Sequence, residues 1–372
     1  MVLIAQTGDS DLLGANFSIG VASKSQHVAS NVLLLTDNSL AYMQRVVVYG
    51  LVVLVAGYVL WLAFSGTPFG KGETVVINSG SASSSDGASS SSGSSGNASS
   101  SNEVKLNIVT LLRFDGIPSM ENPEFVESDV ADDTYDPDEL VLGVEINGEI
   151  HEFGVSGKLI MNALVMYDRE TRSLWSQFLS RAVQGELTGT KLETIPLTLT
   201  TWEKWKETQP ETVALRKSRR GGDPYDSYYF SRSAGVIGES NKDNRLPTKE
   251  LVLGLGFDTD PIAFPHSQLR SEKLVHTSHA GTSAIVYFDP ATDTALAFGA
   301  VVSGQELSFE LIEKGGREWL KDDQTGTLWI PFTGQSYEGE LIGNTLERLH
   351  AVNAFWFAWT DFYPDTDVWG LG

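Results

Sequence analysis

The sequence predicts a mainly β fold with a few helices, of the α+β class, and three observations support this. Short stretches rich in β-branched and aromatic residues alternate with turn residues, which is typical of β-sheet proteins. One block of sequence occurs twice, so we expect an internally duplicated β-rich domain. A long apolar run and a Ser/Gly-rich stretch come before this domain, and they predict one transmembrane helix and a disordered linker.

The chain begins with a weakly patterned N-terminal extension, residues 1–45, and the apolar run follows at residues 46–64. As a helix this uncharged run would be about 28 Å long, enough to cross the hydrocarbon core of a bilayer. A buried core helix is the alternative, but the Ser/Gly-rich segment that follows argues against it. Translation starts at either Met1 or Met43, because a short basic segment precedes the run.

The apolar run is interpreted as an uncleaved anchor. Ala63-Phe64-Ser65 resembles a signal cleavage site, but the run is longer than a usual signal-peptide core. Arg45 and Lys71 flank the run on opposite sides, so charge alone does not set its orientation.

Residues 65–103 form the predicted disordered linker. Its Ser/Gly/Ala-rich part, residues 79–101, cannot bury enough apolar surface to fold. Ser-rich stalks beside an anchor usually face outward, and Asn97-Ala-Ser99 matches a glycosylation acceptor triplet. We therefore expect a single-pass protein of the cell membrane whose C-terminal domain is extracytoplasmic.

The folded domain is predicted to consist of two halves, residues 104–248 and 249–372. Residues 171–212 match residues 325–366 at a constant offset of 154. The matched residues include Trp175 and Trp329, Phe178 and Phe332, Gly185 and Gly339, Trp202 and Trp356, and Trp205 and Trp359.

A shorter match shows that the first half lacks a segment. Residues 139–143 recur at residues 250–254, an offset of 111. The difference between the two offsets means that the second half holds about 43 residues, near Pro265 to Leu307, without a counterpart in the first half. We expect this gap to leave the first half open.

Strand and turn signals predict two hairpins. Residues 104–112 read as a strand, and residues 140–146 lead through Asn147-Gly148 to a returning strand at residues 150–153. Residues 284–288 and 294–298 flank Asp289-Pro290 as a second hairpin, and residues 329–332 predict a further strand.

Each half is predicted to end in a helix. In the first half Thr200 and Glu203 form a capping-box pattern, and the helix ends before Pro210. The corresponding helix of the second half ends before Pro364. An aromatic ligand cage is the alternative to a core-anchoring role for the repeated pairs Trp202 and Trp205, and Trp356 and Trp359; the core role is favoured.

The charge balance argues against nucleic acid as a partner. Asp plus Glu is 48 and Lys plus Arg is 26, a net charge of −22 that would repel phosphates. The excess is interpreted either as a solvated acidic surface or as the adaptation of a halophile to high salt. The chain has no cysteine, which excludes disulfides, thiolate metal sites and cysteine nucleophiles.

A series of motifs in a fixed order resembles a known family. These motifs are Asp115-Gly-Ile-Pro118, Asn122-Pro-Glu-Phe125, residues 141–149, Phe153-Gly-Val-Ser-Gly157, residues 166–177, Asp223-Pro-Tyr225, Arg245-Leu-Pro247, Tyr287-Phe-Asp-Pro290, residues 354–359 and Tyr363-Pro-Asp365. They cover about residues 110–366 and resemble the domain of unknown function 3179 family of bacteria and archaea, including haloarchaea. The resemblance implies no established activity.

The resemblance also implies a chemical feature that this chain lacks. Family members carry a Cys-Pro-Leu-Cys motif in the first half, which would imply metal or redox chemistry. Here it would fall between Glu149 and Phe153, in the missing segment; the aligned second-half positions are residues 288–291. The chain is therefore a degenerate member, a binding or structural derivative, or the product of a truncated gene.

Three sets of residues are candidates for metal or acid–base chemistry. His276 and His279, with His266 upstream, would bind Zn²⁺ if a third ligand converged, and surface histidines are the alternative. The carboxylates of the acidic run at residues 127–138 are candidate Ca²⁺ ligands. The run lacks the spacing of an EF-hand loop, so a solvated acidic loop is favoured. Asp168 and Asp289 are interpreted as turn residues rather than as an acid–base pair.

One basic cluster, residues 216–220, marks the candidate ligand site. The candidate contacts are Arg219, Arg220, Tyr225, Tyr228 and Arg245, and internal ion pairs are the alternative. No cofactor and no catalytic residue is assigned, because the sequence carries no nucleophile-elbow or phosphate-loop motif.

The leading functional hypothesis is a non-catalytic binding or surface module with an unknown ligand. The alternative is an enzyme or metal-binding protein whose cysteine-independent site lies between the two halves.

Overall fold

The computed structural model describes residues 103–116, 125–146, 153–216, 226–229, 231–256, 260–279 and 281–371. It also describes the backbone of short strands closer to the N-terminus: β1 (Leu3–Ala5), β2 (Phe17–Gly20), β3 (Ala29–Val32), β4 (Gln44–Tyr49) and β5 (Glu73–Asn78). The fold is mainly β with a few short helices, as predicted.

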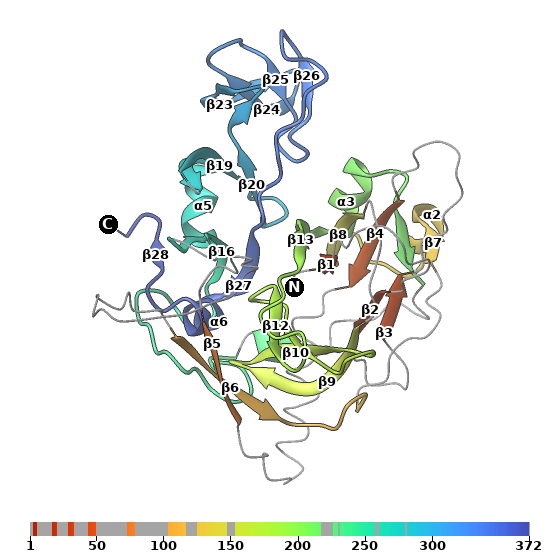
Figure 1. Ribbon diagram of the computed structural model, residues 1–372. Coiled ribbons are helices and arrows are strands. Elements are labelled where there is room, and N and C mark those ends of the chain that lie inside the picture. Colours follow the sequence, from red (N-terminus) through yellow and green to blue (C-terminus); the bar gives the residue numbers. More distant parts are fainter. Residues whose placement is uncertain are drawn as a thin grey trace, which may run out of the picture.

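Two sheets form the first half (Figure 1). One has the order β12-β11-β10-β9-β6-β5 and contains β6 (Glu103–Thr110), β9 (Phe153–Ile160), β10 (Ala163–Asp168), β11 (Leu174–Ser176) and β12 (Arg181–Gln184). The other has the order β14-β8-β4-β15-β7 and contains β7 (Phe125–Glu127), β8 (Leu140–Ile146), β14 (Leu197–Thr201) and β15 (Val213–Leu215). Strand β13 (Glu193–Ile195) pairs with β1, and β2 pairs with β3.

The second half holds three main sheets, of which β23–β26 projects at the top of Figure 1. The first, in the order β27-β16-β17-β28, contains β16 (Leu251–Leu255), β17 (Ile262–Pro265), β27 (Val352–Phe355) and β28 (Asp367–Val368). The others contain β18 (Leu274–His279), β19 (Thr282–Asp289) and β20 (Thr294–Gly299), then β23 (Phe309–Lys314), β24 (Arg317–Asp322), β25 (Leu328–Trp329) and β26 (Ser336–Glu338). Strands β21 (Val301–Val302) and β22 (Gln305–Glu306) pair with each other.

The helices are short. They are α2 (Ser128–Ala131), α3 (Trp202–Thr208), α4 (Asp226–Tyr229), α5 (His266–Glu272) and α6 (Trp356–Phe362). No helix of the described ranges is long and apolar enough to cross a membrane.

The two halves share backbone details at the offsets seen in the sequence. Strands β8 and β14 pair Leu140 with Thr201, and β16 and β27 pair Leu251 with Phe355. Helices α3 and α6 span corresponding residues. Left-handed backbone conformations also recur in pairs: Met161 and Gly315, Asn162 and Gly316, Arg172 and Gly326, Ser180 and Gly334, Gly185 and Gly339, and Gly189 and Gly343.

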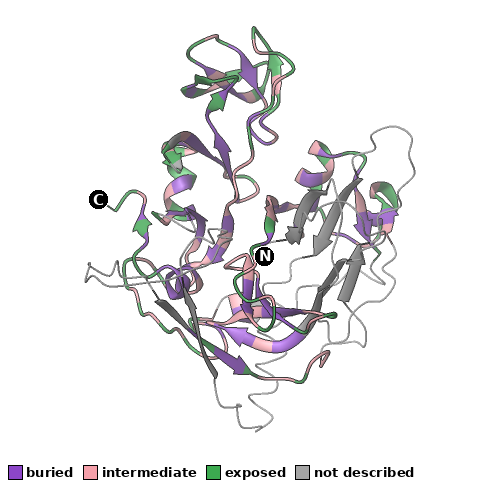
Figure 2. Cartoon of the chain, in the orientation of Figure 1, coloured by how far each residue is buried: buried purple, intermediate pink, exposed green. Residues whose placement is uncertain are grey.

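The apolar core joins the halves crosswise. One core cluster contains Leu174 and Trp175 of the first-half sheet together with Trp356 and Trp359 of α6. The other contains Trp202 and Trp205 of α3 together with residues of β24 and β25. Figure 2 shows buried residues along β9, β10 and β20. Each cluster therefore joins residues of both halves around one of the two helices.

The repeated tryptophans are core anchors, as predicted. All four are almost fully buried. The indole N–H of Trp205 donates to Thr212 Oγ1 at 2.9 Å, and that of Trp359 donates to Thr366 Oγ1 at 2.8 Å. These bonds satisfy the polar edge of each ring, so the rest of the ring is free to pack among apolar side chains.

Two local predictions were wrong. Helix α3 is capped by Thr201, whose side chain accepts from Lys204 N, so the pair Thr200 and Glu203 does not form the predicted capping box. Strands β8 and β9 do not form a hairpin, because they lie in different sheets and β8 pairs with the distant β14. The second predicted hairpin, β19 with β20, is confirmed, and residues 329–332 form a strand only at Trp329.

The N-terminal predictions fall largely outside the described residues. Residues 46–49 belong to β4, which pairs with β8 and β15, and residues 50–64 are not described. Strand β5 lies within the segment predicted as linker and pairs with β6, whereas residues 79–101 are not described. The turn at residues 147–148 also lies outside the described ranges.

A glycine in β16 makes the packing of α6 possible. A Cβ atom at Gly254 would overlap the ring of Trp359. We expect Gly254→Ala to lower the unfolding free energy by about 3 kcal/mol or more, because a fully buried ring has no room to shift. Urea denaturation measures this change. The control is Gly299→Ala, whose new Cβ would lie 3.7 Å from the nearest side-chain atom; an equal loss in both variants would contradict the expectation.

Candidate functional site

The predicted ligand contacts do not assemble into one open site. Arg219, Arg220 and Tyr225 lie outside the described residues. Tyr228 on α4 is buried, and burial raises the pKa of its hydroxyl to about 12. These two features suit a packing role for the Tyr228 ring.

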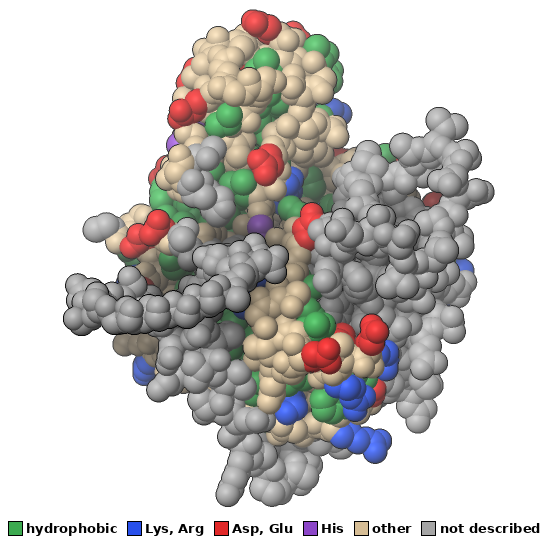
Figure 3. Space-filling model, in the orientation of Figure 1, with side chains coloured by type: hydrophobic (Ala, Val, Ile, Leu, Met, Phe, Trp, Pro, Cys, Tyr) green, Lys and Arg blue, Asp and Glu red, His purple; other side chains and the backbone are tan. Residues whose placement is uncertain are grey.

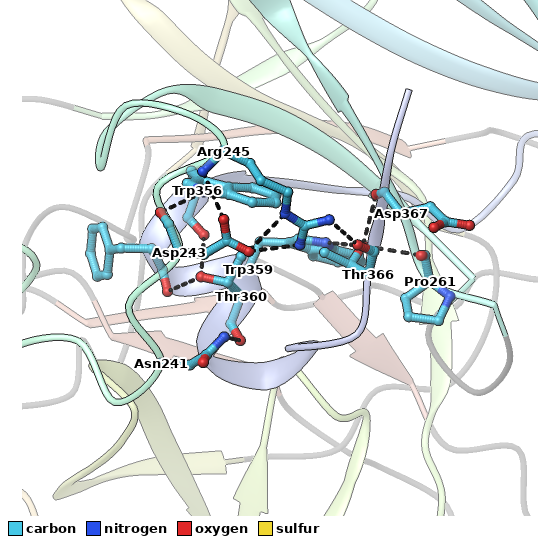
Figure 4. Close-up of polar contacts among 10 residues, drawn as sticks. Asn241, Asp243, Arg245, Pro261, Trp356, Trp359, Thr360, Thr366 and Asp367 are labelled. Carbon is cyan, nitrogen blue, oxygen red and sulfur yellow. Dashed lines mark hydrogen bonds and ion pairs between the residues drawn. The ribbon is translucent and has the colours of Figure 1, made fainter. Parts of the chain in front are cut away.

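Arg245 belongs to an internal network that Figure 4 shows. Its guanidinium donates through Nη1 to Thr366 O at 2.8 Å and through Nη2 to Asp243 Oδ2 at 2.7 Å. It also lies over the ring of Trp356, 5.2 Å from the ring centroid. The bond from Arg245 is the main cause that lowers the pKa of the Asp243 carboxyl. Arg245 therefore fixes the chain against α6 instead of facing a ligand.

Residues 231–250, here named the strap, run from α4 to β16 across both halves. Asn162 of the first half accepts from Val236 N and Ile237 N at 2.7 and 2.8 Å. Asp361 of α6 accepts from Ser240 N and Asn241 N at 2.7 and 2.6 Å. The strap is thus held by side-chain oxygens of both halves.

Lys249 at the end of the strap is enclosed by aromatic rings. Its Nζ lies 3.5 Å from the ring centroid of Tyr228 and donates to Tyr228 O and, at 2.8 Å, to Ser231 Oγ. Burial lowers the pKa of this amine to about 8. The ring face and the two oxygen acceptors favour the charged amine and oppose that shift, so Lys249 serves as a clamp between α4 and the strap.

The predicted metal pair lies in one strand. His276 and His279 both belong to β18. His276 Nε2 accepts from Phe309 N at 3.1 Å, and His266 is buried beside Asn353 at 3.0 Å. Among the described residues, no group of three candidate ligands converges on one point. Metal binding by the histidine pair stays a prediction.

The candidate carboxylates have structural partners. Asp168 accepts from Thr171 N at 2.6 Å and from the Trp175 indole at 2.9 Å, and Asp289 accepts from Ala291 N at 2.9 Å, so both are turn residues, as predicted. Burial raises the pKa of Asp168, but these donated bonds outweigh it and leave the pKa below the ordinary value. In the acidic run, Asp132 binds Lys206 at 2.5 Å and the Trp202 indole at 2.8 Å.

The two halves also meet through a polar contact between β14 and β20. Thr294 Oγ1 donates to Thr200 Oγ1 at 2.8 Å. Nearby, Arg348 extends from the second half to β14, where its Nη atoms lie 3.4 Å from Thr198 Oγ1 and Leu197 O. Its guanidinium carbon lies 5.1 Å from the ring centroid of Phe298. Arg348 is therefore placed at the junction of the halves.

The guanidinium of Arg348 is partly buried but has few hydrogen-bond acceptors. Its Nε is buried without an acceptor, and no carboxylate of the described residues forms an ion pair with it. Burial lowers its pKa to about 10. No motif surrounds Arg348 in the sequence, because its contacts come from distant strands.

Asp361 is the other buried group with an unused atom. The side chain is 4 % exposed, and its Oδ2 has no hydrogen-bond partner. Burial raises the pKa of the Asp361 carboxyl to about 6. The two backbone N–H groups of the strap lower this pKa, but their effect is smaller. The corresponding residue of α3 is Glu207, which is exposed and bound to Lys204.

We expect Asp361 to make stability depend on pH. The native state holds this proton more tightly than the unfolded chain, so the contribution is present below pH 3.8 and is lost as pH rises through about 6. Asp361→Asn does not titrate. The unfolding free energy of the variant minus that of the parent should therefore rise by roughly 2–3 kcal/mol from pH 4 to pH 7 in urea titrations.

The control is Glu207→Gln, for which we expect a difference within about 0.5 kcal/mol across the same range, as for most surface substitutions. A pH-independent difference for Asp361→Asn would contradict the assignment.

Comparison with known proteins gives one family. The family model described as "Protein of unknown function (DUF3179)" matches residues 149–366, a range that includes the strap, Arg348 and α6. No curated protein and no solved structure matches the chain. Because the family model covers more than half of the chain, this protein belongs to the DUF3179 family.

Proposed function

We propose that the protein is a non-catalytic binding module whose ligand carries an oxyanion, a carboxylate or a phosphate, received by Arg348 between the two halves. The observation that carries this proposal is the partly buried guanidinium without a carboxylate partner among the described residues. A desolvated charge that lacks a counter-ion costs free energy. An arginine kept in this state therefore suits a ligand that supplies the missing negative charge.

The chemistry of the guanidinium fits this ligand class. Arginine presents its N–H groups in a plane that matches the two oxygens of a carboxylate or phosphate. The bonds from Arg348 to Thr198 and Leu197 are long, at 3.4 Å, so a charged oxygen would compete well for the same N–H groups.

An internal duplication is part of the proposal. The shared register, the corresponding helices and the recurring left-handed positions support two copies of one unit. Ligand sites occur preferentially where two domains or subdomains meet. The contact of β14 with β20 is such a junction. The alternative function, an enzyme or metal-binding protein with a cysteine-independent site between the halves, would use the same junction.

We expect Arg348→Met to bind inorganic phosphate and acetate at least tenfold more weakly than the parent in calorimetric titrations at constant ionic strength. A charge-assisted hydrogen bond contributes about 1.5–3 kcal/mol, which corresponds to that change or more. The variant should be as stable as the parent, because an uncompensated charge is replaced by an apolar chain of similar length.

The matched control is Arg317→Met, which removes an exposed arginine of β24 and should leave binding unchanged. Equal binding by the parent and Arg348→Met would refute the proposal. A turnover of the bound compound that Arg348→Met abolishes would favour the enzyme alternative.

We also propose that residues 46–64 anchor the domain to the cell membrane, with the domain outside the cytoplasm. The run contains roughly a dozen Val, Leu and Phe residues, and their insertion into a bilayer is worth about 4–7 kcal/mol. The anchor and the pairing of β4 with β8 exclude each other. If the chain crossed the membrane once after residue 49, β4 and β8 would lie on opposite sides of it.

One experiment separates the anchor from the strand. We expect the full chain to sediment with membranes and to resist carbonate extraction. Val47→Cys combined with Gly143→Cys should then form no disulfide, although these residues are paired in β4 and β8. The chain has no other cysteine, so a disulfide together with release by carbonate would establish the strand instead.

A further inference from the structure

A second arginine stands out when the two halves are compared. Arg172, in the turn between β10 and β11, has a left-handed backbone with a φ of 61°. The corresponding residue of the second half is Gly326, with a φ of 71°. Glycine adopts this conformation freely, whereas a residue with a Cβ does so at a cost. The first half thus keeps an arginine where the same turn is built more easily with glycine.

The side chain of Arg172 lies on an aromatic platform. Its guanidinium carbon is 4.6 Å from the ring centroid of Phe114 and 5.1 Å from that of Tyr167. The residue is exposed, and no carboxylate of the described residues pairs with it. Stacking covers one face of the guanidinium and leaves its N–H edges free for a planar partner.

The platform is held in place by a polar network. Tyr167 donates its hydroxyl proton to Asp115 Oδ2 at 2.5 Å, and Arg169 Nη1 lies 3.2 Å from the same hydroxyl. Arg169 is also 3.5 Å from Asp115 Oδ2, so this carboxylate offsets one arginine and leaves the charge of Arg172 uncompensated.

The network is specific to the first half. The counterpart of Tyr167 is Lys321, which pairs with Glu310 at 2.8 Å, and the counterpart of Arg169 is Asp323. The shared hairpin therefore does not need these residues to fold. Figure 3 shows Lys and Arg side chains gathered on the lower part of the molecule, where β9 and β10 lie in Figure 1.

We propose that Arg172, stacked on Phe114 and Tyr167 with Arg169 beside it, forms a second binding site for a carboxylate or phosphate group. The site is separate from Arg348 and rests on different observations. The N–H edges of Arg172 supply paired donors, and the nearby Arg169 guanidinium adds a second positive charge.

Phenylglyoxal, which modifies guanidinium groups, tests the site residue by residue. The full chain is labelled with and without inorganic phosphate, and in parallel with acetate, at constant ionic strength, and modified peptides are quantified by mass spectrometry. We expect at least one of these anions to slow the labelling of Arg172 and Arg169 severalfold, while exposed Arg317 is labelled at an unchanged rate. Unchanged labelling of Arg172 with both anions would overturn the proposal.

Arg172→Gly distinguishes a binding role from a structural one. We expect this variant to keep the urea midpoint of the parent or to exceed it, because glycine relieves the left-handed backbone, while the protection of Arg169 is lost. The matched control is Ser180→Gly, which introduces the glycine found at Gly334 and should retain protection of both arginines. A large fall in the midpoint of Arg172→Gly would show a structural role instead.

Phosphate protection without acetate protection assigns the site to phosphate groups, and protection by both assigns it to oxyanions in general. The Arg348 peptide in the same digest reports on the other site. The two proposals can therefore fail or succeed independently.

Discussion

The crosswise packing of the tryptophan helices is the constraint on which the rest of the structure depends. Trp356 and Trp359 of α6 lie in one apolar cluster with residues of the first-half sheet, and Trp202 and Trp205 of α3 lie in another with residues of the second-half sheet. A buried aromatic side chain contributes about 1.5–3 kcal/mol. Because each cluster holds residues of both halves, we expect the halves to unfold as one cooperative unit. The strap, the contact of β14 with β20 and the position of Arg348 follow from that arrangement.

Features with local causes were predictable from the sequence. The tryptophan pairs, the turn at Asp168 and the hairpin at Asp289 depend on residues a few positions apart, and spacing alone indicated their roles. The failed hairpin between β8 and β9 has the opposite origin. Strand β8 pairs with β14, more than fifty residues further along the chain, and no local signal indicates that pairing.

The candidate site could not be predicted for the same reason. Arg348 stands in a stretch without a motif, and its meaning depends on Phe298 and on backbone atoms of β14. Arg245, in contrast, was singled out because it lies near a basic cluster and a family motif, yet its guanidinium is used by Asp243 and Thr366. Charge in the sequence does not show whether an arginine has an internal partner, and that difference separates a structural arginine from a binding one.

The positions of the two halves that match at an offset of 154 residues supply an internal comparison that a single sequence otherwise lacks. Where both halves carry glycine, as at Gly185 and Gly339, the backbone alone explains the residue. Where only the second half does, the first half accepts a cost of about 1 kcal/mol for each side chain it keeps. Asn162 offsets its cost by binding the strap. For Arg172, only the stacking on Phe114 and Tyr167 offsets the cost of the left-handed backbone. Stacking of an exposed cation on an aromatic ring stabilises by about 0.5–1 kcal/mol. The oxyanion proposed to bind Arg172 would offset the rest of this cost.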